Sequence, residues 1–321
     1  CGGECDALHV YASVDGRLGS LPTPTYEGYR FLGWFDAPSG GHKVTGSTPV
    51  VKDMTLYAQW KDSTIRGECG DSLSWSLNED TGVLRISGSG EMNDYHSADG
   101  LESPWHDYAA IVKSVVIGQG VKTVGNYAFA NLKNLRSVEI NAELKRLGSG
   151  AFYGCTALSD LEGIEGVKVI GGECFRGCSA LSAIGIPTGC TSVGSYAFEG
   201  TAIKSVSVPS SVVSLGEGAF SSCRKLAYAE LPSGISKVSA SLFSGCTALE
   251  AFFVKDDGSY GGASLTVEAN AFSGCSALRE LVIYTRADSL RIAKNAFSGC
   301  TGIKSVSLDC RSLVLEDNAF P

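Results

Sequence analysis

The sequence predicts a mostly β protein in which about nine coils of ~23 residues stack into a solenoid, preceded by a β-hairpin cap and a small β module. Three observations predict this fold. A phenylalanine returns nine times at nearly constant spacing, most units carry a short alternating apolar run, and Gly, Pro and Ser separate the pieces as tight turns require. Units of this kind cannot bury their apolar faces alone, so they stack on copies of themselves.

The repeated phenylalanine defines the units. It occurs at Phe129, Phe152, Phe175, Phe198, Phe220, Phe243, Phe272, Phe297 and Phe320, at intervals of 23, 23, 23, 22, 23, 29, 25 and 23 residues. Ala precedes it in seven of the nine units, and Cys174 and Leu242 take its place in the other two. Because coils stacked at the strand spacing of ~4.8 Å align equivalent side chains, we expect the rings to form one buried ladder.

Each unit is predicted to hold two short extended segments. The first follows the pattern L-x-x-V-x-I, as in residues 181–186 and 203–208, and its last two apolar positions alternate as in a strand with one buried face. The unit that begins at Leu158 departs from this pattern. The second segment ends in an apolar residue five positions before each Phe, such as Val124. A period near 23 with these leucine-like positions lies in the leucine-rich-repeat range.

Six cysteines follow the same phase, three residues after the repeated Phe. They are Cys155, Cys178, Cys223, Cys246, Cys275 and Cys300. A ladder of small, buried thiols fits this pattern better than bridges between chosen pairs, so we expect free thiols, although adjacent coils bring such residues within disulfide distance. Cys1 and Cys5 stand apart and form a separate candidate pair. So many unpaired cysteines in an exported protein would suit an anaerobic bacterium.

Charge and composition divide the chain into three ranges. Residues 63–110 carry two basic and nine acidic side chains, whereas residues 1–62 and 111–321 are close to neutral. We predict a small β module at 1–62, an acidic β cap at 63–110 with a hairpin turn at Asp80-Thr81-Gly82, and the repeats at 111–321. The net charge of −8 argues against nucleic acid as a partner, and no run of eighteen apolar residues is present to span a membrane.

The repeats resemble a known family. Units such as VGSYAFEGTAIKSVSVPSSVVSLGEGAFSSCRKL (193–226) are similar to the BspA-like leucine-rich repeats of bacterial surface proteins, over roughly residues 111–321. The resemblance implies a secreted or cell-surface location. It also implies adhesion to host extracellular-matrix proteins or to surface glycans as the general role.

The N-terminal range resembles a second family. Residues 21–60 look like a Listeria–Bacteroides repeat of the internalin B-repeat type, through Gly33-Trp34-Phe35 and Leu56-Tyr57-Ala58-Gln59-Trp60 among other marks. The resemblance implies a first strand ahead of Gly2-Gly3, so we expect the module to lack that strand. Independently of the family, we expect Trp34, Phe35, Tyr57 and Trp60 to supply the core of this module.

Motifs for catalysis and for cofactors are not expected in this chain. G-x-S-x-G, H-E-x-x-H, P-loop and Rossmann patterns do not occur in a fitting context, and His96 and His106 have no nucleophile to activate. Without C-x-x-C or clustered histidines, no zinc site is expected. A weaker alternative is calcium bound by Asp94, Asp99 and Glu102, although their spacing lacks a calcium-loop pattern. We therefore predict a non-enzymatic protein without a cofactor.

The candidate binding site lies on the outward face of the first strands. The third and fifth positions of L-x-x-V-x-I point away from the core, and most of them are small or polar. The exceptions come from three consecutive coils and from the inserted loop 255–262 beside them: Tyr228, Phe253, Val282, Tyr284 and Tyr260. Rigid aromatic side chains beside a loop are typical anchors for recognition. The alternative is that the insertion covers Phe253 and Val282 and buries them.

Two functions remain open at this stage. The first is a surface adhesin or ligand-binding protein that recognises host or neighbouring-cell proteins or glycans through the repeat face. The second is a structural spacer that holds another domain away from the cell wall. A spacer should be uniformly polar, whereas a binding protein should expose an aromatic patch.

Overall fold

The computed structural model describes residues 9–26, 28–96, 102–255, 264–284 and 288–321. The chain forms two compact units, Cys1–Arg66 with Ser76–Gly82, and Gly67–Trp75 with Val83–Pro321. Each is described by itself, and the predicted boundaries at residues 62 and 110 stay a prediction. In the described part of the chain, no helical segment has the length and apolar character needed to cross a lipid bilayer.

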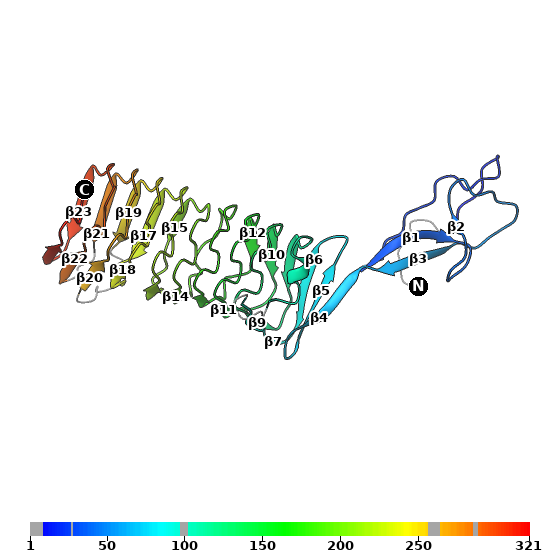
Figure 1. Ribbon diagram of the computed structural model, residues 1–321, viewed down its shortest axis with the longest axis horizontal. Helices are drawn as coiled ribbons and strands as arrows, with labels where there is room; N and C mark the ends of the chain where they lie inside the picture. Colours follow the sequence, from blue (N-terminus) through cyan, green and yellow to red (C-terminus); the bar gives the residue numbers. More distant parts are fainter. Residues whose placement is uncertain (1–8, 27, 97–101, 256–263, 285–287) are drawn as a thin grey trace. The chain divides into compact units, whose positions relative to one another are not determined.

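The first unit contains a three-stranded antiparallel sheet of order β2-β1-β3 (Figure 1). Its strands are β1 (Tyr29–Phe35), β2 (Lys43–Val44) and β3 (Tyr57–Asp62). The register shifts between Phe31 and Gly33, as a β-bulge requires. The small β module expected from the sequence is therefore present.

The expected core of this module is wrong. Trp34, Phe35 and Trp60 are only half-buried and Tyr57 is exposed, whereas Leu18 and Val44 are buried. A single three-stranded sheet has too little volume to enclose several large rings. The aromatic side chains pack on one another at its surface instead, as between Phe31 and Trp60, whose centroids lie 5.3 Å apart.

The second unit is the repeat array with the segment before it. Its strands are β4 (Thr64–Gly70), β5 (Leu73–Asn78), β6 (Val83–Gly88), β7 (Gly90–Glu91), β8 (Ser114–Ile117), β9 (Val121–Val124), β10 (Ser137–Ile140), β11 (Arg146–Leu147), β12 (Asp160–Glu162), β13 (Val169–Ile170), β14 (Ser192–Val193), β15 (Ser205–Ser207), β16 (Ser214–Leu215), β17 (Tyr228–Pro232), β18 (Lys237–Val238), β19 (Ala251–Lys255), β20 (Ser264–Val267), β21 (Glu280–Tyr284), β22 (Ser289–Ile292), β23 (Ser305–Asp309) and β24 (Ser312–Leu315). A 3-10 helix, η2 (His106–Tyr108), precedes β8. Strands β4 and β5 have residues in both units.

The coils stack in register and build two rows of strands, which pair in parallel from β6 and from β7 onward (Figure 1). The first row forms sheets of order β12-β10-β8-β6-β5-β4 and β15-β17-β19-β21-β23, and the second row forms β16-β14-β13-β11-β9-β7 and β18-β20-β22-β24. Equivalent repeat positions are direct partners, as Val138 is to Val115 and to Leu161. The predicted mostly β solenoid is confirmed.

The first row is interrupted at the coil of residues 181–186, where the sequence predicts a strand. Leu181 and Ile186 are buried there, but Ile184 is only half-buried and these residues, all of them described, form no strand. Gly185 lies in the middle of the segment and Pro187 follows it. Because Gly weakens a strand interior and Pro cannot donate to the ladder, the sheet ends on both sides of this coil.

The second row of strands is interrupted between β16 and β18, at the coil where a repeated glycine is replaced by serine. Four positions before the repeated Phe, the first five coils carry Gly125, Gly148, Gly171, Gly194 and Gly216, and the sixth carries Ser239. The backbone N–H of Gly216 donates to the Val193 carbonyl at 2.8 Å, as its equivalents do in earlier coils. At Ser239 the hydroxyl donates to the Leu215 carbonyl. A side-chain bond thus joins the coils where the sheet does not continue.

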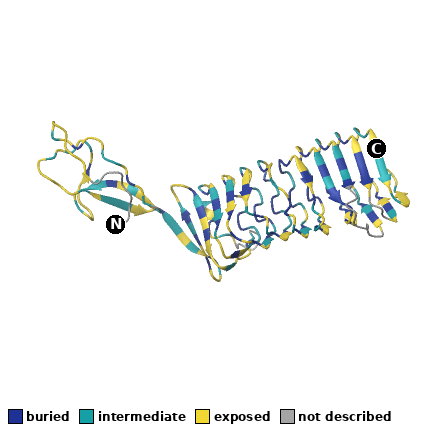
Figure 2. Cartoon of the chain, turned by 180° about the vertical axis from the view of Figure 1, so that it is seen from behind, coloured by how far each residue is buried: buried dark blue, intermediate teal, exposed yellow. Residues whose placement is uncertain are grey.

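The repeated phenylalanines form one stack through the array. Centroids of successive rings, from Phe129 to Phe320, lie 4.7–5.6 Å apart. Eight of the rings are buried, and Phe320 in the last coil is half-buried. Figure 2 shows how burial alternates along the strands, where buried positions lie between exposed ones.

The acidic segment before the repeats extends this stack. Trp105 is fully buried, its ring stacks on Phe129 at 5.3 Å, and its indole N–H donates to the Ala128 carbonyl at 2.8 Å. Strand β6 pairs in parallel with β8, as one coil pairs with the next. The segment therefore closes the first coil with an aromatic ring and a strand of its own. The position of Trp105, 24 residues before Phe129, is the sequence signal for this role.

The repeat-phase thiols are buried and hydrogen-bonded. The Cys178 Sγ–H donates to the Phe152 carbonyl of the preceding coil at 3.1 Å. The other five make the same contact with the Phe of the preceding coil: Cys155 with Phe129, Cys223 with Phe198, Cys246 with Phe220, Cys275 with Phe243 and Cys300 with Phe272. Burial raises the pKa of Cys178 to about 12, so this thiol stays protonated at neutral pH.

We expect these cysteines to be reduced in the purified protein. Thiol titration of the denatured, unreduced chain should find at least six free thiols, because each ladder Sγ–H is occupied as a donor to a carbonyl and a bridge would remove that bond. Titration of the fully reduced chain gives the reference count. Two or fewer free thiols before reduction would contradict the thiol ladder.

Candidate functional site

The aromatic residues predicted on the outward face lie on neighbouring strands. Tyr228 begins β17 and Phe253 is the middle residue of β19, and their ring centroids are 5.4 Å apart at an interplanar angle of 33°. Both rings are half-buried. The Tyr228 hydroxyl donates to the Glu230 carboxylate, which orients the ring. The two strands thus hold these rings side by side, and we call Tyr228 and Phe253 the aromatic pair.

The remaining predicted site residues differ in their placement. Val282 is the direct strand partner of Phe253, but only 8% of it is exposed, so it adds little to a binding surface. Tyr284, two residues further along β21, is 44% exposed. Tyr260 lies outside the described residues. The surface available for contact therefore comes from Tyr228, Phe253 and Tyr284.

Most of the remaining outward positions are small or polar. Equivalent positions on strands of the earlier coils carry Ser137, Glu139, Asp160 and Glu162, and on β15 they carry Ser205 and Ser207. Along β12 and β15 both outward residues are exposed and the central residue is buried. The aromatic pair is thus a local departure from a solvated face.

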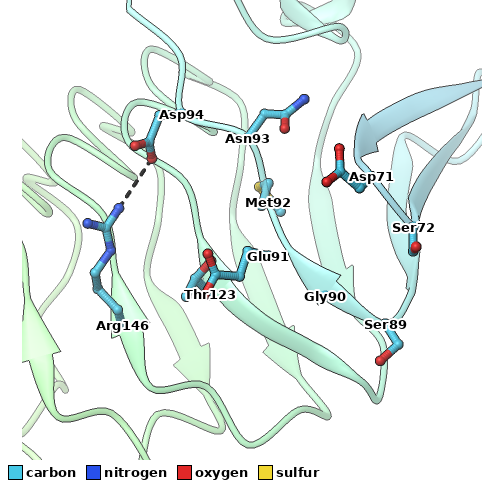
Figure 3. Close-up of a pocket in the computed structure, with 10 residues that line it drawn as sticks. All are labelled: Asp71, Ser72, Ser89, Gly90, Glu91, Met92, Asn93, Asp94, Thr123 and Arg146. Atoms are coloured by element: carbon cyan, nitrogen blue, oxygen red, sulfur yellow. Dashed lines mark hydrogen bonds and ion pairs between the residues drawn. The ribbon is translucent and has the colours of Figure 1, made fainter.

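A second feature is a cavity of about 710 Å³ beside β7. It is lined by Asp71, Ser72, Ser89, Gly90, Glu91, Met92, Asn93, Asp94, Thr123 and Arg146 (Figure 3). The Arg146 guanidinium and the Asp94 carboxylate are 3.2 Å apart, and Asp94 also accepts the Asn126 backbone N–H at 2.7 Å. The wall has three carboxylates against one guanidinium, which suits hydroxyl-rich or cationic groups. The sequence did not predict this cavity because its residues come from segments that are separate along the chain.

The calcium alternative has no support in the geometry. Asp94 contacts Arg146 and Asn126, Glu102 Oε2 lies 2.8 Å from His106 Nε2, and Asp99 lies outside the described residues. Within the part of the chain that is described, no group of three or more His, Cys, Asp or Glu side chains is arranged to hold a metal ion.

Three solved leucine-rich repeat proteins are similar to this chain to different degrees. One from Bacteroides ovatus is 20% identical, with a TM-score of 0.50 over 78% of this chain and 76% of that one. A leucine-rich repeat protein from Eubacterium ventriosum is 19% identical, with a TM-score of 0.47 over 80% and 94%. The leucine-rich repeat protein of T. pallidum is 25% identical, with a TM-score of 0.49 over 66% and 91%.

Sequence families match both parts of the chain. Residues 2–59 match the Listeria-Bacteroides repeat domain. Residues 107–227, 156–264 and 191–321 match the BspA-type leucine-rich repeat region, so that the matches together cover well over half of the 321 residues. The chain therefore belongs to the BspA-type leucine-rich repeat family.

Proposed function

We propose that this protein is a non-enzymatic bacterial binding protein, secreted or held at the cell surface, that recognises a partner through the outward face of its repeats. The aromatic pair carries the proposal. Membership of the BspA-type family supports a surface role, and the partner we expect is a host extracellular-matrix protein or a glycan on a neighbouring surface.

The aromatic pair has the properties of a recognition anchor. Tyr and Phe rings bury large areas on contact, and they lose little conformational freedom because each has only two side-chain torsions. The Tyr228 ring is held by Glu230 and by contact with Phe253, so its side chain loses less conformational entropy when a partner binds. The parallel strands beneath are part of a five-stranded sheet, which keeps the pair in place.

A structural spacer is the competing function. It would keep its outward face polar throughout, since an exposed aromatic ring on a spacer risks unwanted association. The half-exposed Tyr228 and Phe253 and the exposed Tyr284 favour a binding role over a spacer.

Replacing Tyr228 and Phe253 together by Ser should weaken binding to the partner by about 30-fold or more, because even one anchor residue of this type contributes on the order of 2 kcal/mol. The partner is first sought by screening the full chain against arrayed matrix proteins and glycans, and affinity is then measured by surface plasmon resonance. Ser137→Ala, at the Tyr228-equivalent position of an earlier coil, is the matched control and should bind normally. Unchanged affinity in a folded double variant would place the site elsewhere, and a screen without any partner would favour the spacer.

A further inference from the structure

Each coil contains one residue with a left-handed backbone conformation at the turn just before the repeated Phe. Two positions before the repeated Phe, all nine coils have a positive φ between 51° and 59°. Six coils carry a glycine, a serine or an asparagine there: Gly150, Gly218, Ser241, Asn270, Asn295 and Asn318. The other three carry Tyr127, Glu173 and Tyr196. All three belong to the first four coils.

Large side chains at these positions need an explanation. The left-handed region suits Gly and Asn, and a bulky residue there costs of order 1–3 kcal/mol. Such strain persists where the surroundings over-determine it, and ligand sites are one such place. The first coils could have used Gly or Asn as the last three do. Their retained Tyr and Glu side chains therefore indicate a role beyond the turn.

The repeat position directly after the repeated Phe also differs between the early and the later coils. One position after the repeated Phe, coils two to four carry Tyr153, Arg176 and Glu199. The next four coils carry Ser221, Ser244, Ser273 and Ser298. At both repeat positions, aromatic and charged side chains therefore occur in the early coils, and smaller side chains occur in the later coils.

These side chains form one connected network. The Tyr127 ring lies across Gly150, where a Cβ would stand 2.1 Å from it, and its hydroxyl reaches the Glu173 carboxylate at 3.1 Å. Arg176 is the centre of the network. Its Nη1 lies 2.7 Å from Glu173 Oε1 and its Nε 2.6 Å from Glu199 Oε2.

Two rings hold the Arg176 guanidinium in place as well. Its carbon lies 5.9 Å from the Tyr153 ring centroid and 5.6 Å from the Tyr196 ring centroid, within cation–π distance of both. Burial, together with the nearby Glu173 carboxylate, raises the pKa of Tyr127, so its hydroxyl keeps its proton and remains a donor. The network is therefore rigid before any ligand arrives.

The network forms one wall of a cavity of about 400 Å³, within the range of about 300–1,000 Å³ that ligand pockets occupy. Tyr127, Tyr153, Glu173 and Arg176 line it from these two repeat positions. The lining also includes Tyr95, Glu102 and His106, and Glu102 Oε2 lies 2.8 Å from His106 Nε2. The cavity thus combines aromatic rings with carboxylate acceptors and guanidinium donors.

We propose that this cavity binds a neutral oligosaccharide. The Arg176 guanidinium is already paired with Glu173 and Glu199, so an ionic ligand would have to break existing ion pairs, whereas a neutral polyol need not. Sugar hydroxyls can donate to the remaining lone pairs of Glu173 and accept from Arg176, since ionised groups make the stronger hydrogen bonds. The apolar face of a sugar ring packs on Tyr153. The site is independent of the aromatic pair on β17 and β19.

The test is a glycan array probed with the full chain, followed by titration calorimetry with the best neutral oligosaccharide. Tyr153→Ala should weaken that binding about tenfold or more, because it removes the packing ring. Tyr153→Phe keeps the ring and should bind nearly as the native chain does. Ser244→Ala changes the same repeat position in a later coil and is the matched control. Thermal melting of each variant establishes that it is folded.

Each outcome decides the proposal. Loss of neutral-glycan binding in folded Tyr153→Ala, with retention in Tyr153→Phe and in Ser244→Ala, supports it. Exclusive binding to peptides or to anionic glycans, no glycan binding at all, or unchanged affinity in Tyr153→Ala would overturn it. The variant with Tyr228→Ser and Phe253→Ser should still bind the glycan, so failure of the function proposed for the aromatic pair would be seen separately.

Discussion

Replacing Phe198 by Ala should lower the free energy of unfolding by about 3–5 kcal/mol. The ring is 2% exposed and lies between Phe175 and Phe220, at centroid distances of 5.3 and 5.4 Å. Its removal loses the burial of an aromatic side chain and leaves a void between two coils, which the stacked rings on either side cannot fill without breaking their own register. Phe220→Ala should have a similar effect for the same reason.

Denaturant unfolding followed by circular dichroism measures this difference. Val213→Ala in the same part of the array is the control: Val213 is 75% exposed, and we expect a change within about 0.5 kcal/mol. An unchanged unfolding midpoint for Phe198→Ala would mean that the ring stack contributes little to stability.

Replacing Gly194 by Ala should destabilise the array by about 3 kcal/mol, near the upper end of what overpacking costs. A Cβ at this position would lie 2.3 Å from the backbone nitrogen of Gly172 and 2.7 Å from the carbonyl carbon of Gly171. These are backbone atoms of the preceding coil and cannot rotate away. The coil would have to separate from its neighbour, and the Gly194 N–H bond to the Ile170 carbonyl, 2.9 Å long, would lengthen.

Gly234→Ala is the matched control for this substitution. No heavy atom lies within 4 Å of a Cβ placed there, so it should leave stability nearly unchanged. Thermal melting of the two variants compares them directly. Equal melting temperatures would show that the repeated glycine is not required for close packing of the coils.

Much of the candidate binding surface could be predicted from the sequence. Alternation along the first strands places Tyr228 and Phe253 outward, and the repeat phase brings them to neighbouring strands, where their rings are 5.4 Å apart. The sequence left open whether Val282 is buried, because alternation gives the direction of a side chain and not what surrounds it. The cavity lined by Tyr153 and Arg176 was not predicted, because these residues carry no signal in the sequence and come together only when neighbouring coils stack.

By itself the sequence determined the repeat length, the mostly β solenoid and the phase of the Phe and Cys positions, because these depend on local spacing that each coil repeats. Only the tertiary structure decided where the sheets are interrupted, that Trp105 closes the stack, and which side chains share a cavity. Those features depend on how closely the backbones of adjacent coils approach. That distance is set by single residues such as Gly216 and Ser239, whose effect appears only when one coil is packed against the next.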